Sequence, residues 1–184
     1  MKVLPLTLCL SLLSSGIGFK SHAALASSAQ SSNLQGLAVC ANPMISCNRS
    51  YKTFAPYELG LHLPSTIKPN RDYKSMPFYG VVLKVASVGV EQICDGGEFS
   101  TQWEKERKRV QGWFSQRKVF ANHQCPDMAA VSYIVDGRNN NLAFIAVYGG
   151  ATSKEASLVL AKMKRIYKGA RLQRMQVVFQ QIVQ

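Results

Sequence analysis

The fold is decided by residues 142–156, which read Leu142-Ala-Phe-Ile-Ala-Val-Tyr-Gly-Gly-Ala-Thr-Ser-Lys-Glu-Ala156. The first seven residues are apolar and Gly149-Gly150 ends the run, which predicts a buried strand. Thr152-Ser-Lys-Glu155 is then a capping box, in which the Thr and Glu side chains satisfy free amides at a helix start. We expect the helix to end at Gly169, a suitable C-terminal cap. This stretch therefore predicts a strand that turns directly into a helix.

A second strand and helix are expected upstream of this stretch. Residues 79–88 are β-branched and almost continuously apolar, which predicts a central strand. Thr101-Gln-Trp-Glu104 is another capping box, and apolar residues follow it at helical spacing. The helix that begins there extends to Phe120 unless it breaks near Gly112.

A hairpin and a final strand complete the predicted sheet. Met128–Val135 is expected to pair with the strand at residue 142, because residues 136–141 are rich in turn formers. Leu172–Val183 alternates between apolar and polar residues, which predicts a half-buried strand. Residues 78–184 therefore follow the order β-α-β-β-α-β, an α+β fold in which both helices cover one face of an antiparallel sheet. This is the ferredoxin-like split βαβ, whose last strand lies at a sheet edge with its polar face accessible.

The N-terminal part of the chain predicts export. Lys2 is followed by an apolar stretch to Phe19 and by Ala24-Leu-Ala26, the pattern of a secretory signal peptide in residues 1–26. An uncleaved membrane anchor is the alternative, since the apolar stretch approaches the length of a span. Residues 27–77 are expected to be a flexible leader and an irregular, proline-rich arm. We therefore expect a periplasmic protein without a membrane span after cleavage, with a secreted or a signal-anchored protein as the alternatives.

Four cysteines remain after the signal peptide. An even number of cysteines in an exported chain indicates disulfides. Cys40 with Cys47 would close a short loop and Cys94 with Cys125 would bracket the first helix, and we favour this arrangement among the three that are open. A zinc site is the competing interpretation. No C-x-x-C occurs and His123 beside Cys125 is the single ligand-like pair, so no metal is expected.

The chain is strongly basic, with 22 Lys and Arg against 10 Asp and Glu and a formal net charge of +12. Such a charge suits nucleic acid as well as the anionic polymers of a bacterial envelope. The run Glu104-Lys-Glu-Arg-Lys-Arg109 mixes both signs at helical spacing, which is typical of a solvated helix face. A phosphate-binding stripe is therefore the weaker interpretation, and nucleic acid is not the expected partner.

Residues 78–184 resemble the sporulation-related repeat (SPOR) domain, a peptidoglycan-binding module of bacterial envelope proteins, and the resemblance is strongest over residues 142–170. The resemblance rests on the strand that ends in Gly149-Gly150, on Thr152-Ser-Lys-Glu-Ala156 and on the apolar helix that follows. It implies a non-catalytic protein that binds glycan strands stripped of stem peptides through the helix-free face of the sheet. The alternative is a protein-interaction accessory factor of an envelope machine, such as a pilus, secretion or conjugation system, that docks through the proline-rich arm.

Glycans present hydroxyl and amide groups, which need hydrogen-bonding side chains and an aromatic surface. On this ground we expect the ligand to contact the polar face of the last strand, one charge of the first strand and one aromatic residue: Arg174, Gln176, Gln180, Lys84 and Tyr148. Lys84 joins that face if its aliphatic neighbours pack under the helices. Tyr148 is also consistent with a core position, since aromatic residues are often buried.

The sequence contains none of the common enzyme motifs. G-x-S-x-G, a Walker glycine loop, H-E-x-x-H and C-x-x-C do not occur. His123 and Cys125 resemble a thiol–imidazole pair, but a cysteine of an exported chain is expected to be oxidised and therefore not nucleophilic. No catalytic residue and no cofactor is expected.

Overall fold

A computed structural model describes residues 55–60, 72–94, 97–125, 129 and 131–179. The chain divides into two compact units, Met1–Asn33 and Leu34–Gln184, and all described residues belong to the second. The predictions for the signal peptide, for Cys40 and Cys47 and for Gln180 lie outside the described residues. No helix among the described residues is long and apolar enough to cross a membrane.

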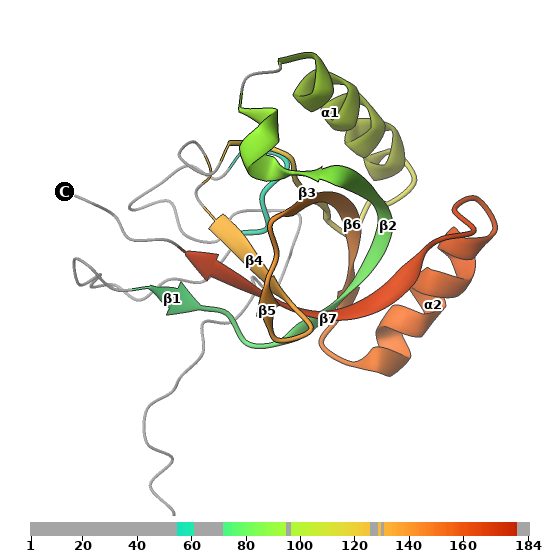
Figure 1. Cartoon of the computed structure of the whole chain (residues 1–184). Helices are drawn as coiled ribbons and strands as arrows, with labels where there is room; N and C mark the ends of the chain where they lie inside the picture. The colour runs from blue at the N-terminus through green and yellow to red at the C-terminus, as the bar shows by residue number, and fades with distance from the viewer. Residues whose placement is uncertain (1–54, 61–71, 95–96, 126–128, 130, 180–184) are drawn as a thin grey trace, which may run out of the picture. The chain divides into compact units, whose positions relative to one another are not determined.

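The described part is an α+β protein with a seven-stranded antiparallel sheet and two α-helices (Figure 1). The hydrogen-bonded order of the strands is β3-β6-β2-β7-β4-β5, and β1 also pairs with β7. The strands are β1 (Tyr73–Lys74), β2 (Phe78–Gly89), β3 (Val119–Asn122), β4 (Val131–Val135), β5 (Arg138–Asn139), β6 (Leu142–Gly150) and β7 (Arg171–Phe179). The helices are the 3-10 helix η1 (Val90–Ile93), α1 (Gly97–Gln111) and α2 (Ser153–Lys164).

The predicted hairpin between Met128–Val135 and the strand at residue 142 is wrong. β4 turns at Asp136-Gly137 and pairs with β5 on one side and with β7 on the other. The place beside β6 belongs to β3, whose first two residues, Val119 and Phe120, were expected at the end of an unbroken first helix. β7 therefore lies inside the sheet and not at its edge, because β4 covers the side that was expected to be free.

Of the two capping boxes predicted from the sequence, the structure contains the one at the start of α2 and not the one in α1. In α2 the Glu155 amide donates to Thr152 Oγ1 at 3.3 Å and the Thr152 amide donates to Glu155 Oε2 at 3.1 Å, so this capping box is confirmed. α2 ends at Lys164, and turns lead from there toward Gly169. The capping box at Thr101 is wrong, because Thr101 lies inside α1 and its hydroxyl donates to the Gly97 carbonyl at 2.7 Å.

Both helices pack on the same face of the sheet, as predicted. Trp103 and Val110 of α1 and Val159 and Met163 of α2 are buried in one apolar cluster. The sheet side of this cluster comes from alternating residues of three strands, Val81 and Leu83 of β2, Val119 and Ala121 of β3, and Ala143, Ile145 and Val147 of β6. Burial of this apolar surface holds the helices to the sheet.

The other face of the sheet is also packed, so the expectation of a helix-free face open to a glycan is wrong. Its buried residues form a second apolar cluster, which includes Phe78, Val82, Phe120, Val131, Tyr133, Phe144, Ala146, Met175, Val177 and Phe179. Phe120 on β3 and Tyr133 on β4 belong to strands far apart in the sheet order, yet their ring centroids lie 5.4 Å apart. The sheet therefore curls around an apolar interior. β2 is visibly bent in Figure 1, and its register shifts are the bulges that permit such curvature.

Residues 55–60 lie between the two ends of the curled sheet. The Ala121 amide of β3 donates to the Tyr57 carbonyl at 2.9 Å. Residues 55–60 also contact β4, because the Leu59 amide donates to the Tyr133 hydroxyl at 3.4 Å. Leu59 itself is 0% exposed within the interior cluster. A short part of the proline-rich arm thus contributes to the core of the sheet.

The disulfide between Cys94 and Cys125 is confirmed, with a Cα–Cα distance of 4.8 Å. It links the end of η1 to the segment that follows β3. The competing zinc interpretation finds no support in the described residues, which contain no group of three or more His, Cys, Asp or Glu placed to hold a metal ion. Of the two lengths considered for the first helix, the structure shows the shorter, because α1 ends at Gln111.

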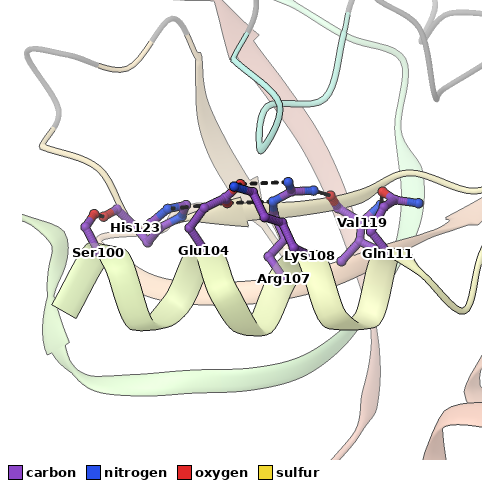
Figure 2. A network of polar contacts seen from close by, with 7 residues as sticks. All are labelled: Ser100, Glu104, Arg107, Lys108, Gln111, Val119 and His123. Carbon is purple, nitrogen blue, oxygen red and sulfur yellow. Dashed lines mark hydrogen bonds and ion pairs between the residues drawn. The ribbon is translucent and has the colours of Figure 1, made fainter. Parts of the chain in front are cut away.

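A buried polar network joins α1 to β3 (Figure 2). Arg107 is only 4% exposed, donates to both carboxylate oxygens of Glu104 and reaches the Val119 carbonyl at 3.1 Å. Gln111 accepts from the Val119 amide at 2.8 Å. The expectation that residues 104–109 form a solvated helix face is therefore wrong at Arg107, because its guanidinium satisfies a carbonyl under the helix.

Candidate ligand-binding site

A cavity of about 450 Å³ opens where the first residues of β6 and β7 meet the middle of β2 and the β4–β5 turn. Its apolar wall comes from Val82, Val85, Val135, Leu142 and Phe144, and its polar wall from Asp136, Arg138, Asn139, Asn140, Arg171 and Gln173. A cavity in the range of roughly 300–1,000 Å³ accepts a small molecule or the end of a larger one. An apolar wall with a few hydrogen-bonding groups is the usual composition of such a site.

Strand register explains why Arg171 and Gln173 line this cavity. Arg171 pairs with Val82, and Gln173 pairs with Gly80. Directly paired residues of neighbouring strands project from the same face of a sheet. Since Val82 belongs to the interior cluster, Arg171 and Gln173 also lie on the inner face of the curled sheet. Arg171 and Gln173 of the polar wall therefore belong to the same sheet face as the interior cluster, at the end of that face where the cavity opens.

The turn at Asp136-Gly137 organises the polar wall. Both residues have positive φ, 49° and 80°, the backbone conformation of a tight two-residue hairpin turn. Asp136 Oδ1 accepts from the Arg174 amide at 3.0 Å, and Asp136 Oδ2 accepts from Gln173 Nε2 at 3.1 Å. These bonds hold the Gln173 side chain in place and engage both oxygens of the carboxylate.

Arg138 and Arg171 give the cavity its charge. Within the described part of the chain, neither guanidinium makes an ion pair or a side-chain hydrogen bond. Asp136 is the single acidic residue among those that line the cavity, so two positive charges stand against one negative charge. Arginine presents its donors in a planar fork that suits carboxylate and phosphate groups. The cavity is thus chemically suited to a ligand that offers acceptors or a negative charge.

The lining groups of the cavity are of few chemical kinds. The residues around the cavity include no Ser, Thr, Cys, His or Lys and a single carboxylate, Asp136. They supply guanidinium and amide donors, amide acceptors and an apolar wall.

The residues predicted from the sequence do not meet at one place. Arg174 is exposed and pairs with Tyr79, so it lies on the outer face of β7. Gln176 lies two residues further on and donates to the Ser75 carbonyl at 2.9 Å. Tyr148 pairs with Gly80, which places it on the inner face, opposite to Arg174. Its ring packs 5.5 Å from that of Phe78, and burial, followed by the charge of Glu155, raises the pKa of the Tyr148 hydroxyl.

Lys84 lies apart from the other predicted residues. Its Nζ is 5.1 Å from the centre of the Trp103 ring, so the side chain extends toward α1. The register shift between Val82 and Lys84 is the physical reason, because a bulge changes the face to which the following side chain points. Val81 and Leu83 pack under the helices as the prediction for Lys84 required, whereas Val85 faces the interior. Lys84 and Arg174 therefore both lie on the helix-bearing face, and not on a helix-free face.

Sequence reasoning missed the residues that line the cavity. Arg138, Asn139 and Asn140 were counted only as turn formers, and Arg171 was not included in the last strand. The one signal for them in the sequence is the position of Arg138 and Arg171 next to predicted strands. The cavity depends on β4 pairing with β7, which no local pattern predicts.

In comparisons with known proteins, no protein family, no curated protein and no solved structure matches the chain. The cavity and its lining residues are therefore the feature from which a function is inferred.

Proposed function

We propose that this protein is an exported, non-catalytic binding protein of the bacterial cell envelope, and that its ligand is a glycan strand of peptidoglycan. The observation that carries the proposal is the cavity lined by Arg138, Arg171 and Gln173 above an apolar wall. Amino sugars offer hydroxyl and acetamido groups to such donors and acceptors, while their C–H faces and acetyl methyl groups suit apolar side chains. The glycan would enter the cavity and not lie across the sheet.

Export is supported by two features of different kind. The N-terminal 26 residues have the pattern of a signal peptide. Cys94 and Cys125 form a disulfide, a bond that persists in oxidising compartments such as the periplasm. The resemblance of residues 142–170 to the SPOR domain favours peptidoglycan among the polymers that such a compartment offers.

We also infer that part of the fold is a ferredoxin-like unit. β2, α1, β3, β6, α2 and β7 follow the chain order β-α-β-β-α-β, and their strands neighbour one another as β7-β2-β6-β3. Under this proposal β4 and β5 are an insertion between β3 and β6 that pairs with the far side of β7. The insertion contributes Arg138 and the Asp136 turn, so the cavity would be an addition to the basic unit.

Cosedimentation with purified sacculi tests the proposed function. We expect the purified protein to sediment with sacculi and an Arg138→Gln/Arg171→Gln variant to remain largely in the supernatant. Lys154→Gln/Arg165→Gln is the matched control, because it removes two charges from exposed positions of α2 and its C-cap. Absence of cosedimentation by the wild-type protein would refute the function, and equal sedimentation of the cavity variant would place the site elsewhere.

Affinity capture from crosslinked cells distinguishes the alternative function. An accessory factor of an envelope machine would retain a stoichiometric protein partner after enzymatic digestion of the wall. The proposed glycan-binding protein would lose its captured material on digestion. A retained partner would therefore count against the proposal.

A further inference from the structure

We infer, resting on the proposed function, that the cavity selects muramic acid residues by binding the lactyl carboxylate of the sugar with Arg138 and Arg171. The two arginines belong to different strands, β5 and β7, and line the same cavity. N-acetylmuramic acid differs from N-acetylglucosamine by the lactyl ether, which carries the single negative charge of each disaccharide repeat in a glycan strand without stem peptides. The charge of the cavity thus corresponds to the group that distinguishes the two sugars.

The arginines are free to bind an anion. The described residues offer no carboxylate partner to Arg138 or Arg171. Asp136, the acid beside them, already accepts from Gln173 and from the Arg174 amide. Two like charges that share a cavity favour the entry of an anion, because it relieves their mutual repulsion. Each guanidinium fork can donate two parallel hydrogen bonds to a carboxylate.

The neutral groups of the cavity suit the rest of the sugar. The Gln173 amide nitrogen is bound to Asp136, which leaves its oxygen directed to other donors. Asn139 is exposed and lies next to Arg138. Val85, Val135 and Leu142 are the less buried residues of the apolar wall, against which an acetyl methyl group can pack. The carboxylate would therefore be fixed at the arginines while the acetamido group contacts the amides and the apolar wall.

Isothermal titration calorimetry with three matched saccharides tests this inference. The first is the peptide-free tetrasaccharide of alternating N-acetylglucosamine and N-acetylmuramic acid, the second is the same compound with its carboxyls methyl-esterified, and the third is chitotetraose. We expect the wild-type protein to bind the first at least about tenfold more tightly than the other two, since a charge-assisted pair is worth that much or more. We also expect this preference to shrink as salt is raised.

Variants assign the preference to the two arginines. Arg138→Gln/Arg171→Gln should bind all three saccharides with similar, weak affinity, whereas Lys154→Gln/Arg165→Gln should keep the wild-type preference. Arg171→Lys keeps the charge but loses the fork, so it should retain part of the preference. Thermal unfolding of each variant, followed by circular dichroism, verifies that it is folded.

The outcomes separate this inference from the proposed function. If the wild-type protein binds the muramyl saccharide, its ester and chitotetraose equally, carboxylate recognition is refuted while glycan binding stands. If it binds none of the three, the proposed function is refuted. If the preference exists but survives in folded Arg138→Gln/Arg171→Gln, recognition of the carboxylate by these arginines is refuted.

Discussion

Phe120 of β3 stacks against Tyr133 of β4, with their ring centroids 5.4 Å apart and their planes inclined by 29°, although three strands separate β3 from β4 in the sheet. This contact can form only if the sheet curls until its two ends face each other. The curling encloses one face as a second core and leaves a cavity where the enclosed face opens. The candidate site is therefore a product of sheet curvature and not of a flat polar surface.

Leu59→Ala is predicted to destabilise the protein by about 2–5 kcal/mol, the range for truncating a fully buried leucine. The reason is that Leu59 fills the interior between β3 and β4 and the substitution leaves a void there. Urea unfolding followed by fluorescence measures the change. Leu158→Ala on α2 is the control, because Leu158 is 74% exposed and its truncation should change stability by less than about 0.5 kcal/mol. Equal effects of the two substitutions would contradict the placement of residues 55–60.

Glu104→Gln is predicted to destabilise the protein by about 3 kcal/mol, because it leaves the buried Arg107 guanidinium without its carboxylate. The same change at Glu106 should be smaller, on the order of 1 kcal/mol, since its partner Arg109 is half exposed and solvent screens the pair. Denaturant titration of both variants provides the comparison. A larger loss for Glu106→Gln than for Glu104→Gln would show that the network in Figure 2 does not hold α1 to β3.

Stability is predicted to decline as pH falls from about 6.5 to about 4, by up to about 3 kcal/mol in total. His123 is 0% exposed, and this burial is the main reason why the pKa of its imidazole is lowered to about 4. The negative charge of Glu104 acts in the opposite direction, and the positive charge of Arg107 lowers the pKa further. The unfolded chain, whose histidine has a pKa near 6.5, then binds a proton in this window while the folded chain does not. Proton binding by the unfolded chain therefore lowers the free energy of unfolding in this window. No such effect of His123 is expected above the histidine pKa of the unfolded chain, which is about 6.5.

His123→Phe isolates this effect, because phenylalanine keeps a ring against Tyr57 and does not titrate. Stability measured at several pH values should decline less for the variant than for the wild type between 6.5 and 4. Below that window both proteins should weaken together as Glu106 protonates, since Arg109 first and Tyr167 next hold the pKa of its carboxyl at about 2 against the effect of burial. Parallel curves across the window from 6.5 to 4 would contradict the assignment to His123.

Cys94→Ser/Cys125→Ser is predicted to lower the free energy of unfolding by about 3–4 kcal/mol, as expected for a bridge between residues 31 apart. The loss arises mainly because the unfolded chain regains conformational freedom. Thermal unfolding with and without a reductant measures it. The reductant should shift the wild-type protein toward the variant and affect the variant far less. Equal stability of the oxidised wild type and the variant would contradict a structural role for this bond.

Much of the secondary structure followed from local patterns. The capping box at Thr152 and Glu155 and the alternation of Met175, Val177 and Phe179 depend on residues close in sequence, and the structure agrees with them. The pairing of Cys94 with Cys125 was also favoured correctly, because few cysteines leave few arrangements. The α+β class and the placement of both helices on one face followed from the order of these elements.

The sheet order, the buried Arg107, the contribution of Leu59 and the cavity were decided by tertiary structure alone. The backbone hydrogen bonds are the same between any two strands, so they do not decide which strands pair. β4 lies next to β7 and not next to β6 because strand pairing depends on which apolar surfaces meet across long sequence separations. A single bulge before Lys84 was enough to direct that side chain to α1 and not to the inner face, where strict alternation with Val82 would have placed it. Sequence therefore determined most of the segments that became helix or strand, with β3 and β5 as exceptions, whereas the curling of the sheet determined which polar residues came to share a cavity.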